Sequence, residues 1–130
     1  MKNKVCLVTG GNAGIGKATA LGLAKLGAIV VLVCRNKSEG EKTIQTISEV
    51  SQTSGHKLLN ADLSDFDSIR RCANDFKKQF NRLDVLINNA GAFYTKRQYT
   101  RNNVEMQFSV NHLAPFLLTN LLLEVLLKCD

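Results

Sequence analysis

Short apolar runs alternate with amphipathic stretches along the whole chain. The runs are rich in Val, Ile and Leu and are bounded by Gly or polar residues, so they predict strands, whereas apolar residues at helical spacing predict helices. The predicted strands cover residues 4–9, 28–34, 56–59 and 84–88. The predicted helices cover residues 14–26, 38–54, 64–80 and 113–127. Because strands alternate with helices, the pattern predicts an α/β fold with a doubly wound parallel sheet and right-handed crossovers.

Local polar residues predict where two of these helices begin. Ser38 followed by Glu41 resembles a capping box for the second helix, and Gly55 predicts its end. Ser64 with Asp67 predicts the start of the third helix. The fourth strand is apolar enough that we expect it to be buried on both faces.

A glycine-rich segment joins the first strand to the first helix. Residues 9–16 read TGGNAGIG, and a turn this tight with a ligand against its backbone needs residues without a Cβ atom. Free N–H groups and the positive end of the helix dipole would then face a pyrophosphate. The alternative is a glycine-rich turn with no ligand. Its position after a strand and before a helix favours a dinucleotide-binding turn.

The end of the second strand predicts which dinucleotide is bound. An acidic residue at this point hydrogen-bonds the ribose 2′-hydroxyl of NAD, whereas an arginine accommodates the 2′-phosphate of NADP. Here the strand ends in Cys34-Arg35-Asn36, without a carboxylate. The guanidinium fork of Arg35 suits phosphate, so NADP(H) is favoured over NAD(H). The alternative is that Arg35 is an exposed loop residue before the next helix.

Composition restricts the class of protein. The chain has 130 residues, 45% hydrophobic and 22% charged, which predicts one globular domain over residues 1–130. No apolar run reaches the length of a membrane span and no secretory signal precedes the first strand, so we expect a cytoplasmic protein without a membrane span.

The charged residues and cysteines add no further site. The net charge is +6, but the basic residues are dispersed or lie on the polar side of one helix, so no nucleic-acid partner is expected. The cysteines lack the spacing of a zinc site or a redox motif, which predicts reduced structural thiols and no metal. They are Cys6, Cys34, Cys72 and Cys129.

Five motifs occur in the order and at the spacing typical of one enzyme family. They are the segment 9–16, Cys34-Arg35-Asn36, Asp62-Leu63, Asn88-Asn89-Ala90-Gly91 and Val110-Asn111-His112. Together they resemble the short-chain dehydrogenase/reductase family, and the second and last of them look most like its retinol dehydrogenase-like branch. The resemblance covers the whole chain. It implies a Rossmann-type sheet, here truncated after the fourth strand and the long helix that follows.

The resemblance also implies a cofactor site. The phosphates and the adenosine ribose are assigned to Gly10, Asn12, Gly14, Ile15 and Gly16, and the 2′-phosphate to Arg35 and Asn36. Adenine is assigned to Asp62 and Leu63. The rest of the cofactor site is assigned to Asn89, Ala90, Gly91 and Val110, with the backbone of Ala90 and Gly91 passing the nicotinamide ribose. Asp62 has a second interpretation, as part of a loop that caps the helix at Ser64. Both roles are compatible.

Asn111 is the one catalytic residue that the resemblance implies for this chain. In the family, the main-chain carbonyl of this residue holds a water in the proton relay. Pro115 follows four residues later and has no N–H to donate to that carbonyl, which predicts a kinked helix with an open acceptor. The alternative is that Pro115 marks the start of a new helix with Asn111 as its cap.

The family's catalytic Ser and its Tyr-x-x-x-Lys pair are missing from the chain. Tyr94 is followed four positions later by Gln98, and Tyr99 by Asn103. Without the phenol, no acid protonates the developing alkoxide during hydride transfer. We therefore expect the cofactor-binding half of an NADP(H)-dependent oxidoreductase for lipophilic, retinol-like alcohols or carbonyls, inactive alone and dependent on a C-terminal half for substrate.

The last predicted helix is apolar on nearly every side. Residues 116–127 present Phe, Leu and Val around most of the helix, a pattern that a half-exposed surface helix does not tolerate. This predicts self-association or a protein partner through 116–127. It also supports a second hypothesis for the function: the chain is a non-catalytic truncated isoform that serves as a nucleotide-binding or protein-interaction module.

Overall fold

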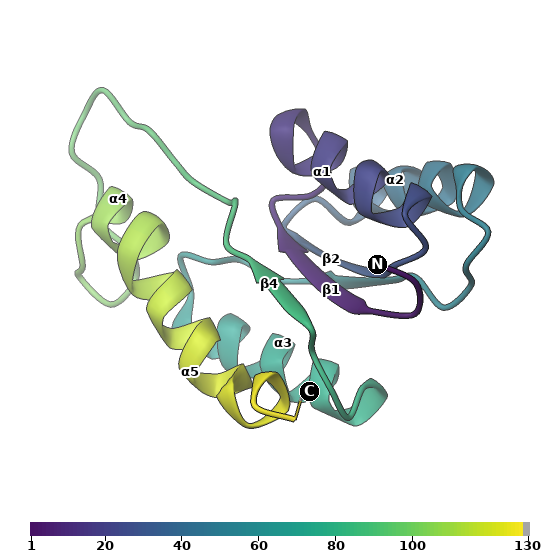
Figure 1. The fold of residues 1–130 in the computed structure, drawn as a ribbon. Helices are drawn as coiled ribbons and strands as arrows, with labels where there is room; N and C mark the ends of the chain where they lie inside the picture. Colours follow the sequence, from purple (N-terminus) through teal and green to yellow (C-terminus); the bar gives the residue numbers. More distant parts are fainter. Residues whose placement is uncertain (129–130) are drawn as a thin grey trace.

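The computed structural model describes residues 1–128, so the prediction for Cys129 lies outside the described residues. Four parallel strands form one sheet in the order β3-β2-β1-β4 (Figure 1). The strands are β1 Val5–Thr9, β2 Ile29–Cys34, β3 Lys57–Asn60 and β4 Val85–Ile87. The helices are α1 Gly14–Lys25, α2 Lys37–Val50, α3 Phe66–Gln79, α4 Met106–Phe108, the π-helix η1 Ser109–Leu113 and α5 Ala114–Leu126. The predicted doubly wound α/β architecture is confirmed.

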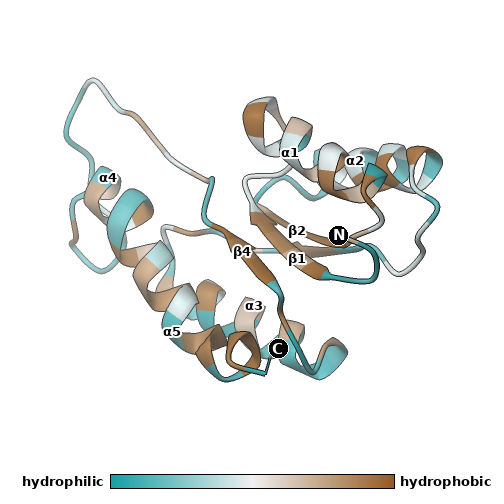
Figure 2. Cartoon of the chain, in the orientation of Figure 1, coloured by the Kyte–Doolittle hydropathy of each residue, from teal (hydrophilic) through white to brown (hydrophobic). Residues whose placement is uncertain are grey.

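Helices cover both faces of the sheet, and each face has its own apolar core. α1 and α2 lie on one face, whereas α3 and α5 pack together on the other (Figure 1). The strands are strongly hydrophobic between helices that are hydrophobic on their inner sides (Figure 2). Leu32 and Ile47 belong to the core under α1 and α2, while Leu7, Phe76 and Leu118 belong to the core under α3 and α5. Burial on both faces explains the continuous apolar composition of β1 and β2.

The fourth strand differs from its prediction. All three residues of β4 are only half-buried. Within the described residues β4 pairs with β1 alone, so it is an edge strand of the sheet and is less covered than its neighbours. The strand still packs on both faces, through Leu86 on one core and Ile87 on the other, but it is half-buried and not fully buried as expected.

Two helix starts also differ from the capping residues that the sequence predicted. Helix α2 begins at Lys37 because the Asn36 side chain accepts a hydrogen bond from Glu39 N at 3.2 Å, and it ends at Val50 rather than near Gly55. The capping box at Ser38 is therefore wrong. Helix α3 is capped by Asp65, whose side chain accepts from Asp67 N at 2.9 Å, and not by Ser64.

The C-terminal helical segment contains a π turn before its proline. The Ala114 N–H donates to the Ser109 carbonyl, five residues back, and Pro115 lies in the first turn of α5. Asn111 lies inside η1, so its alternative role as the N-cap of a new helix is wrong. π turns are rare and recur at functional sites. Here the turn lets the chain pass Pro115 without ending the helical path.

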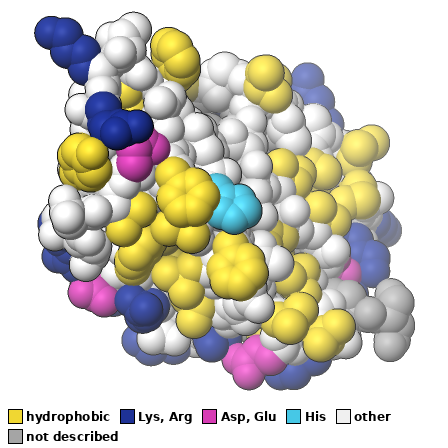
Figure 3. All heavy atoms as spheres, turned by 90° about the vertical axis from the view of Figure 1, so that its left-hand side faces the viewer, with side chains coloured by type: hydrophobic (Ala, Val, Ile, Leu, Met, Phe, Trp, Pro, Cys, Tyr) yellow, Lys and Arg dark blue, Asp and Glu magenta, His cyan; other side chains and the backbone are white. Residues whose placement is uncertain are grey.

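One side of this segment is buried and the other is exposed. Ala114, Leu118, Leu122 and Val125 are buried against the rest of the fold, whereas Phe108, Phe116, Leu123 and Leu127 are between 44% and 75% exposed. Apolar side chains gather on this surface around the single histidine visible in Figure 3. Met106–Leu126 is long and apolar enough to cross a membrane by length and composition alone. Its C-terminal part, α5, packs against α3.

Candidate functional site: a cavity at the carboxyl ends of the strands

A cavity of about 330 Å³ opens beyond the carboxyl ends of β1, β2 and β4. This is the position where open α/β sheets bind ligands. Nine of the residues predicted from sequence line it: Gly10, Asn12, Arg35, Asp62, Leu63, Asn89, Ala90, Gly91 and Val110. The cavity lining does not include Gly14, Ile15, Gly16, Asn36 or Asn111. Four loops and the π-helix η1 thus converge on one cavity.

The glycine-rich turn owes its shape to three glycines. Gly10 and Gly14 have φ angles of +66° and +51°, which side chains other than glycine rarely adopt. A Cβ atom on Gly16 would lie less than 3.0 Å from the Gly10 carbonyl oxygen and from the Asn89 side chain. The start of α1 can therefore approach the end of β1 closely only with glycine at this position.

The first turn of α1 is suited to an anion. Its N-cap residue, Ala13, makes no side-chain capping bond, and the first turn contains no acidic residue. The N–H groups at a helix start lack intrahelical partners, and the helix dipole adds a partial positive charge there. Ile15 is 80% exposed beside these groups. A pyrophosphate would supply the missing acceptors.

Thr9 and Asn89 fasten the glycine-rich turn to the end of β4. The Thr9 hydroxyl oxygen accepts from Asn89 N at 3.1 Å and from Ala90 N at 3.0 Å. The Asn89 side-chain amide donates to the carbonyls of Thr9 at 2.9 Å and Gly10 at 3.3 Å. The sequence had singled out Asn89 but not Thr9. A hydroxyl at the end of an otherwise apolar strand was the available signal.

Arg35 is a cation without a partner at the rim of the cavity. It is exposed and, within residues 1–128, its guanidinium forms no ion pair or hydrogen bond. The Asn60 side chain donates to the carbonyls of Cys34 and Arg35 at 3.0 Å and 2.8 Å and so fixes this loop, a role that the sequence did not reveal. Asn36 caps α2, so its side-chain oxygen is already used.

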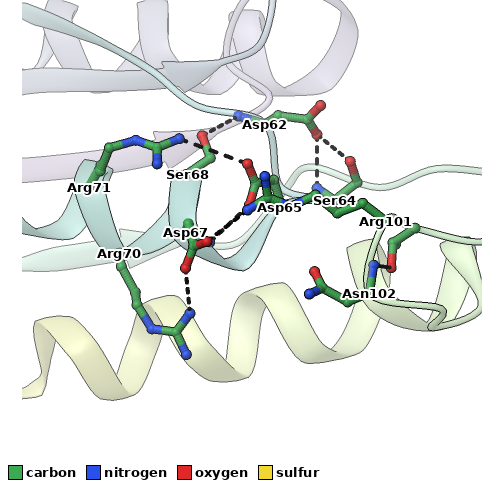
Figure 4. Close-up of polar contacts among 10 residues, drawn as sticks. Asp62, Ser64, Asp65, Asp67, Ser68, Arg70, Arg71, Arg101 and Asn102 are labelled. Atoms are coloured by element: carbon green, nitrogen blue, oxygen red, sulfur yellow. Dashed lines mark hydrogen bonds and ion pairs between the residues drawn. The ribbon is translucent and has the colours of Figure 1, made fainter.

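Asp62 fulfils the loop role predicted for it. Its Oδ1 accepts from the backbone N and the hydroxyl of Ser64 at 2.9 Å and 2.7 Å, which makes the loop before α3 rigid. Its Oδ2 points away from these donors (Figure 4). Asp62 and Leu63 both line the cavity, so the loop contacts leave Asp62 in its wall.

Asn111 holds the loop after β4 through its side chain. Its Oδ1 accepts from Ala92 N at 2.7 Å, and its Nδ2 donates to the Ala92 carbonyl at 2.8 Å. This pairing uses both polar ends of the amide, and a carboxylate or a leucine could not reproduce it. The sequence analysis had considered only the backbone carbonyl of Asn111.

The cysteines and acidic residues add no second chemical centre. Cys6, Cys34 and Cys72 are buried and unpaired. Burial raises the pKa of the Cys6 thiol to about 11 and that of Cys72 to about 12, and it also raises the pKa of Cys34. These thiols are protonated at neutral pH and are poor nucleophiles. Among the described residues, no group of three His, Cys, Asp or Glu side chains is placed to hold a metal ion.

The parallel sheet, the glycine-rich turn and the cavity at the strand ends define a Rossmann-type α/β fold. A sequence profile described as "short chain dehydrogenase" matches residues 4–130. The chain belongs to the short-chain dehydrogenase/reductase family, whose members bind a nicotinamide cofactor.

Several relatives are known by sequence. Human retinol dehydrogenase 11 is 48% identical over 129 residues, which cover 97% of this chain and 40% of that protein. Human retinol dehydrogenase 13 is 42% identical over 123 residues, which cover 95% of this chain and 37% of that protein. The chain thus spans about two fifths of the length of these curated relatives.

Solved structures share the fold. The Pseudomonas aeruginosa RhlG/NADP active-site complex superposes with a TM-score of 0.83 at 30% identity, covering 96% of this chain and 48% of the other. A metagenomic short-chain oxidoreductase in complex with NADP gives a TM-score of 0.79 at 31% identity, covering 93% of this chain and 55% of the other. These values support the Rossmann-type fold with sequence likeness throughout.

Proposed function

We propose that this chain binds NADP(H) in preference to NAD(H) and is the cofactor-binding half of an oxidoreductase. The observation that carries the proposal is that one cavity is lined both by Gly10 and Asn12, from the turn that leads into α1, and by Arg35, whose guanidinium has no partner within residues 1–128. A pyrophosphate fits the first, and a ribose 2′-phosphate fits the second. Two of the structural neighbours are complexes with NADP, which supports the same cofactor.

Each wall of the cavity has a role in this proposal. The turn 10–16 binds the diphosphate through backbone N–H groups, because Gly10 and Gly14 take the left-handed conformation and Gly16 leaves no room for a side chain. Arg35 pairs with the 2′-phosphate as a guanidinium fork. Asp62 Oδ2 accepts from the adenine amino group, and the backbone at Ala90 and Gly91 adjoins the nicotinamide ribose. The bound cofactor would supply or accept a hydride.

The substrate class is proposed from the relatives. Retinol dehydrogenases are among the most similar curated proteins, so a lipophilic alcohol or carbonyl is the expected substrate of the complete enzyme. Within this chain Asn111 is the catalytic residue, through a main-chain carbonyl that holds water. The family's Ser and Tyr-x-x-x-Lys do not occur in the printed sequence. We therefore expect this chain alone to bind cofactor and to turn over little or no substrate.

Thermal shift and titration calorimetry with NADPH and NADH test the cofactor assignment. NADPH should stabilise the wild-type chain more than NADH, and Arg35→Asp should abolish or reverse the difference, since a carboxylate repels the 2′-phosphate and accepts from the NADH ribose. Arg97→Asp makes the same charge change outside the cavity and should keep the preference for NADPH. Equal stabilisation by both cofactors in the wild-type chain would reject the assignment.

A second candidate function rests on the exposed side of the C-terminal helical segment. Phe116 is 65% exposed and Leu127 is 75% exposed, on a surface where other apolar side chains gather (Figure 3). We propose that this face binds a second copy of the chain, as a nucleotide-binding interaction module would. Sedimentation velocity should then give a dimer that Phe116→Gln converts to a folded monomer. A folded wild-type monomer across the concentration range would reject it.

A further inference from the structure

Arg101 is the tip of a compact turn in the long loop between β4 and α4. The Thr100 N–H donates to the Val104 carbonyl at 2.9 Å, and the Thr100 hydroxyl accepts from Asn102 N and Val104 N at 3.3 Å each. Thr100 is buried, and Asn103 takes the left-handed conformation that closes the turn. The turn therefore presents the Arg101 side chain from a fixed backbone.

The Arg101 guanidinium binds two carboxylates at the start of α3. Its Nη2 lies 2.6 Å from Asp65 Oδ1 and 2.8 Å from Asp67 Oδ2 (Figure 4). Asp65 is the N-cap of α3, and its side chain is only 21% exposed. Two neighbouring arginines of α3, Arg70 and Arg71, pair with the same carboxylates from within the helix. Arg101 is thus a clasp between the loop and α3.

This clasp joins two walls of the cofactor cavity. The loop 91–105 contributes Ala92 and Tyr94 to the lining, while the segment just before α3 contributes Asp62, Leu63 and Ser64. Within residues 1–128, the ion pairs and hydrogen bonds of Arg101 are the ones that tie this loop to the start of α3. The side-chain hydrogen bonds that join the loop to other elements lead to α4 and η1.

Rigid hydrogen bonds connect the clasp to the predicted adenine contact. The Asp65 N–H donates to the Asp62 carbonyl at 3.2 Å, and the Asp62 N–H donates to the Ser68 hydroxyl at 3.0 Å. A shift of the α3 start would therefore move Asp62 with it. Arg101 does not line the cavity.

We infer that Arg101 is a positioning residue for NADP(H): it holds the loop 91–105 against the start of α3 and so fixes the adenine side of the cavity. The inference rests on the proposed function. The ion pairs are partly exposed, so the effect on affinity is modest, about threefold to tenfold in Kd. Because the clasp acts on the adenine side, its loss should weaken binding of the adenosine half of the cofactor as much as binding of the whole cofactor.

The test measures the Kd of NADPH and of 2′,5′-ADP by calorimetry, together with trypsin cleavage of the ligand-free chain at Lys96 and Arg97. Arg101→Gln should weaken both ligands about threefold to tenfold and speed cleavage of the loop. Arg101→Lys should restore part of both effects, since it keeps a charged nitrogen but on a shorter side chain. Arg70→Gln, which removes an Asp67 ion pair that does not reach the loop, should change neither.

The outcomes separate the clasp from the proposed function. If Arg101→Gln is too unstable to purify, Asp67→Asn removes one arm of the clasp, keeps the Asp65 cap and should give the same pattern more weakly. Unchanged Kd values for both ligands in a folded clasp variant would overturn the inference, whether or not the loop is cleaved faster. Failure of the wild-type chain to bind NADPH would instead overturn the proposed function, and the inference with it.

Discussion

Gly16 in α1 lies against the carbonyl of Gly10, so closely that a methyl group on Gly16 would overlap that oxygen. The contact brings the start of α1 onto the end of β1. This close contact is the physical reason for a glycine six positions after Gly10. Any larger residue at position 16 must push the helix away from the strand.

Gly16→Ala should therefore destabilise the chain by about 1–3 kcal/mol, because the added methyl group has no space. It should also weaken NADPH binding, since the helix start moves off the diphosphate. Chemical denaturation and calorimetry measure the two effects. Gly22→Ala is the matched control in the same helix: nothing lies within 4 Å of its added Cβ, so it should stabilise by about 0.5–1 kcal/mol. Equal effects of the two variants would contradict the account of the turn.

The Asn111 side chain should control the exchange of one particular amide. Ala92 N–H donates to Asn111 Oδ1, so it should be protected from hydrogen exchange in the wild-type chain. Asn111→Leu should remove that protection, whereas Asn111→Asp, which keeps an acceptor oxygen, should retain part of it. Amide exchange followed by NMR makes the measurement. Protection of Ala92 that survives in the leucine variant would show that another group holds the loop.

His56 should make stability depend on pH. Its Nδ1 accepts from Val30 N at 3.0 Å, which requires the neutral ring, and burial lowers the pKa of His56 below its ordinary value of 6.5. The folded state thus resists protonation more than the unfolded state does. The contribution is fully present above pH 6.5 and is lost as the pH falls through the lowered pKa of the folded state.

Asparagine at position 56 separates this effect from general acid sensitivity. His56→Asn offers an acceptor oxygen near the place of Nδ1 and cannot titrate, so unfolding free energies measured downward from about pH 6.5 should lose part of their slope. His112→Asn changes the other histidine of the chain, which is exposed and stacked on Phe108, and should leave the slope as it is. The reverse pattern would assign the pH dependence to the surface.

Asp84 should contribute to stability in acid. Burial would raise the pKa of this carboxyl, but hydrogen bonds from Arg82, Lys4 and the Val5 N–H together hold it well below its usual range. The contribution is therefore present above the ordinary pKa of about 3.9 and is lost as the pH falls further. Asp84→Asn should cost about 1–3 kcal/mol at neutral pH and flatten the acid limb of the stability curve. Acid denaturation curves of equal slope would count against this role.

The sequence predicted most of the fold because its strands and helices differ in apolar periodicity, and that periodicity follows burial. β1, β2, α1 and α3 were expected within a few residues of their observed bounds. The caps were less predictable: the sequence analysis placed them at Ser38 and Ser64, whereas Asn36 and Asp65 cap the two helices. Which residue caps each helix depends on where the strand before that helix ends.

The site was predictable where it depends on residue type and not where it depends on long-range contacts. Glycines at a strand end and an arginine without a nearby carboxylate indicated the cavity around Gly10 and Arg35. The π turn at Ser109–Leu113 has no signature in hydrophobic spacing. The clasp of Arg101 joins residues that lie 34 and 36 positions apart, so only the folded chain brings them together.

The most direct test of the central claim is an NMR titration of the ¹⁵N-labelled chain with NADPH. If the backbone between Thr9 and Gly16 binds the diphosphate, the amide signals of residues 10–16 should shift strongly and saturably, together with those near Arg35. Signals in the distant part of α2 should stay in place. Saturating NADPH that leaves the amides of residues 10–16 unchanged would contradict the account.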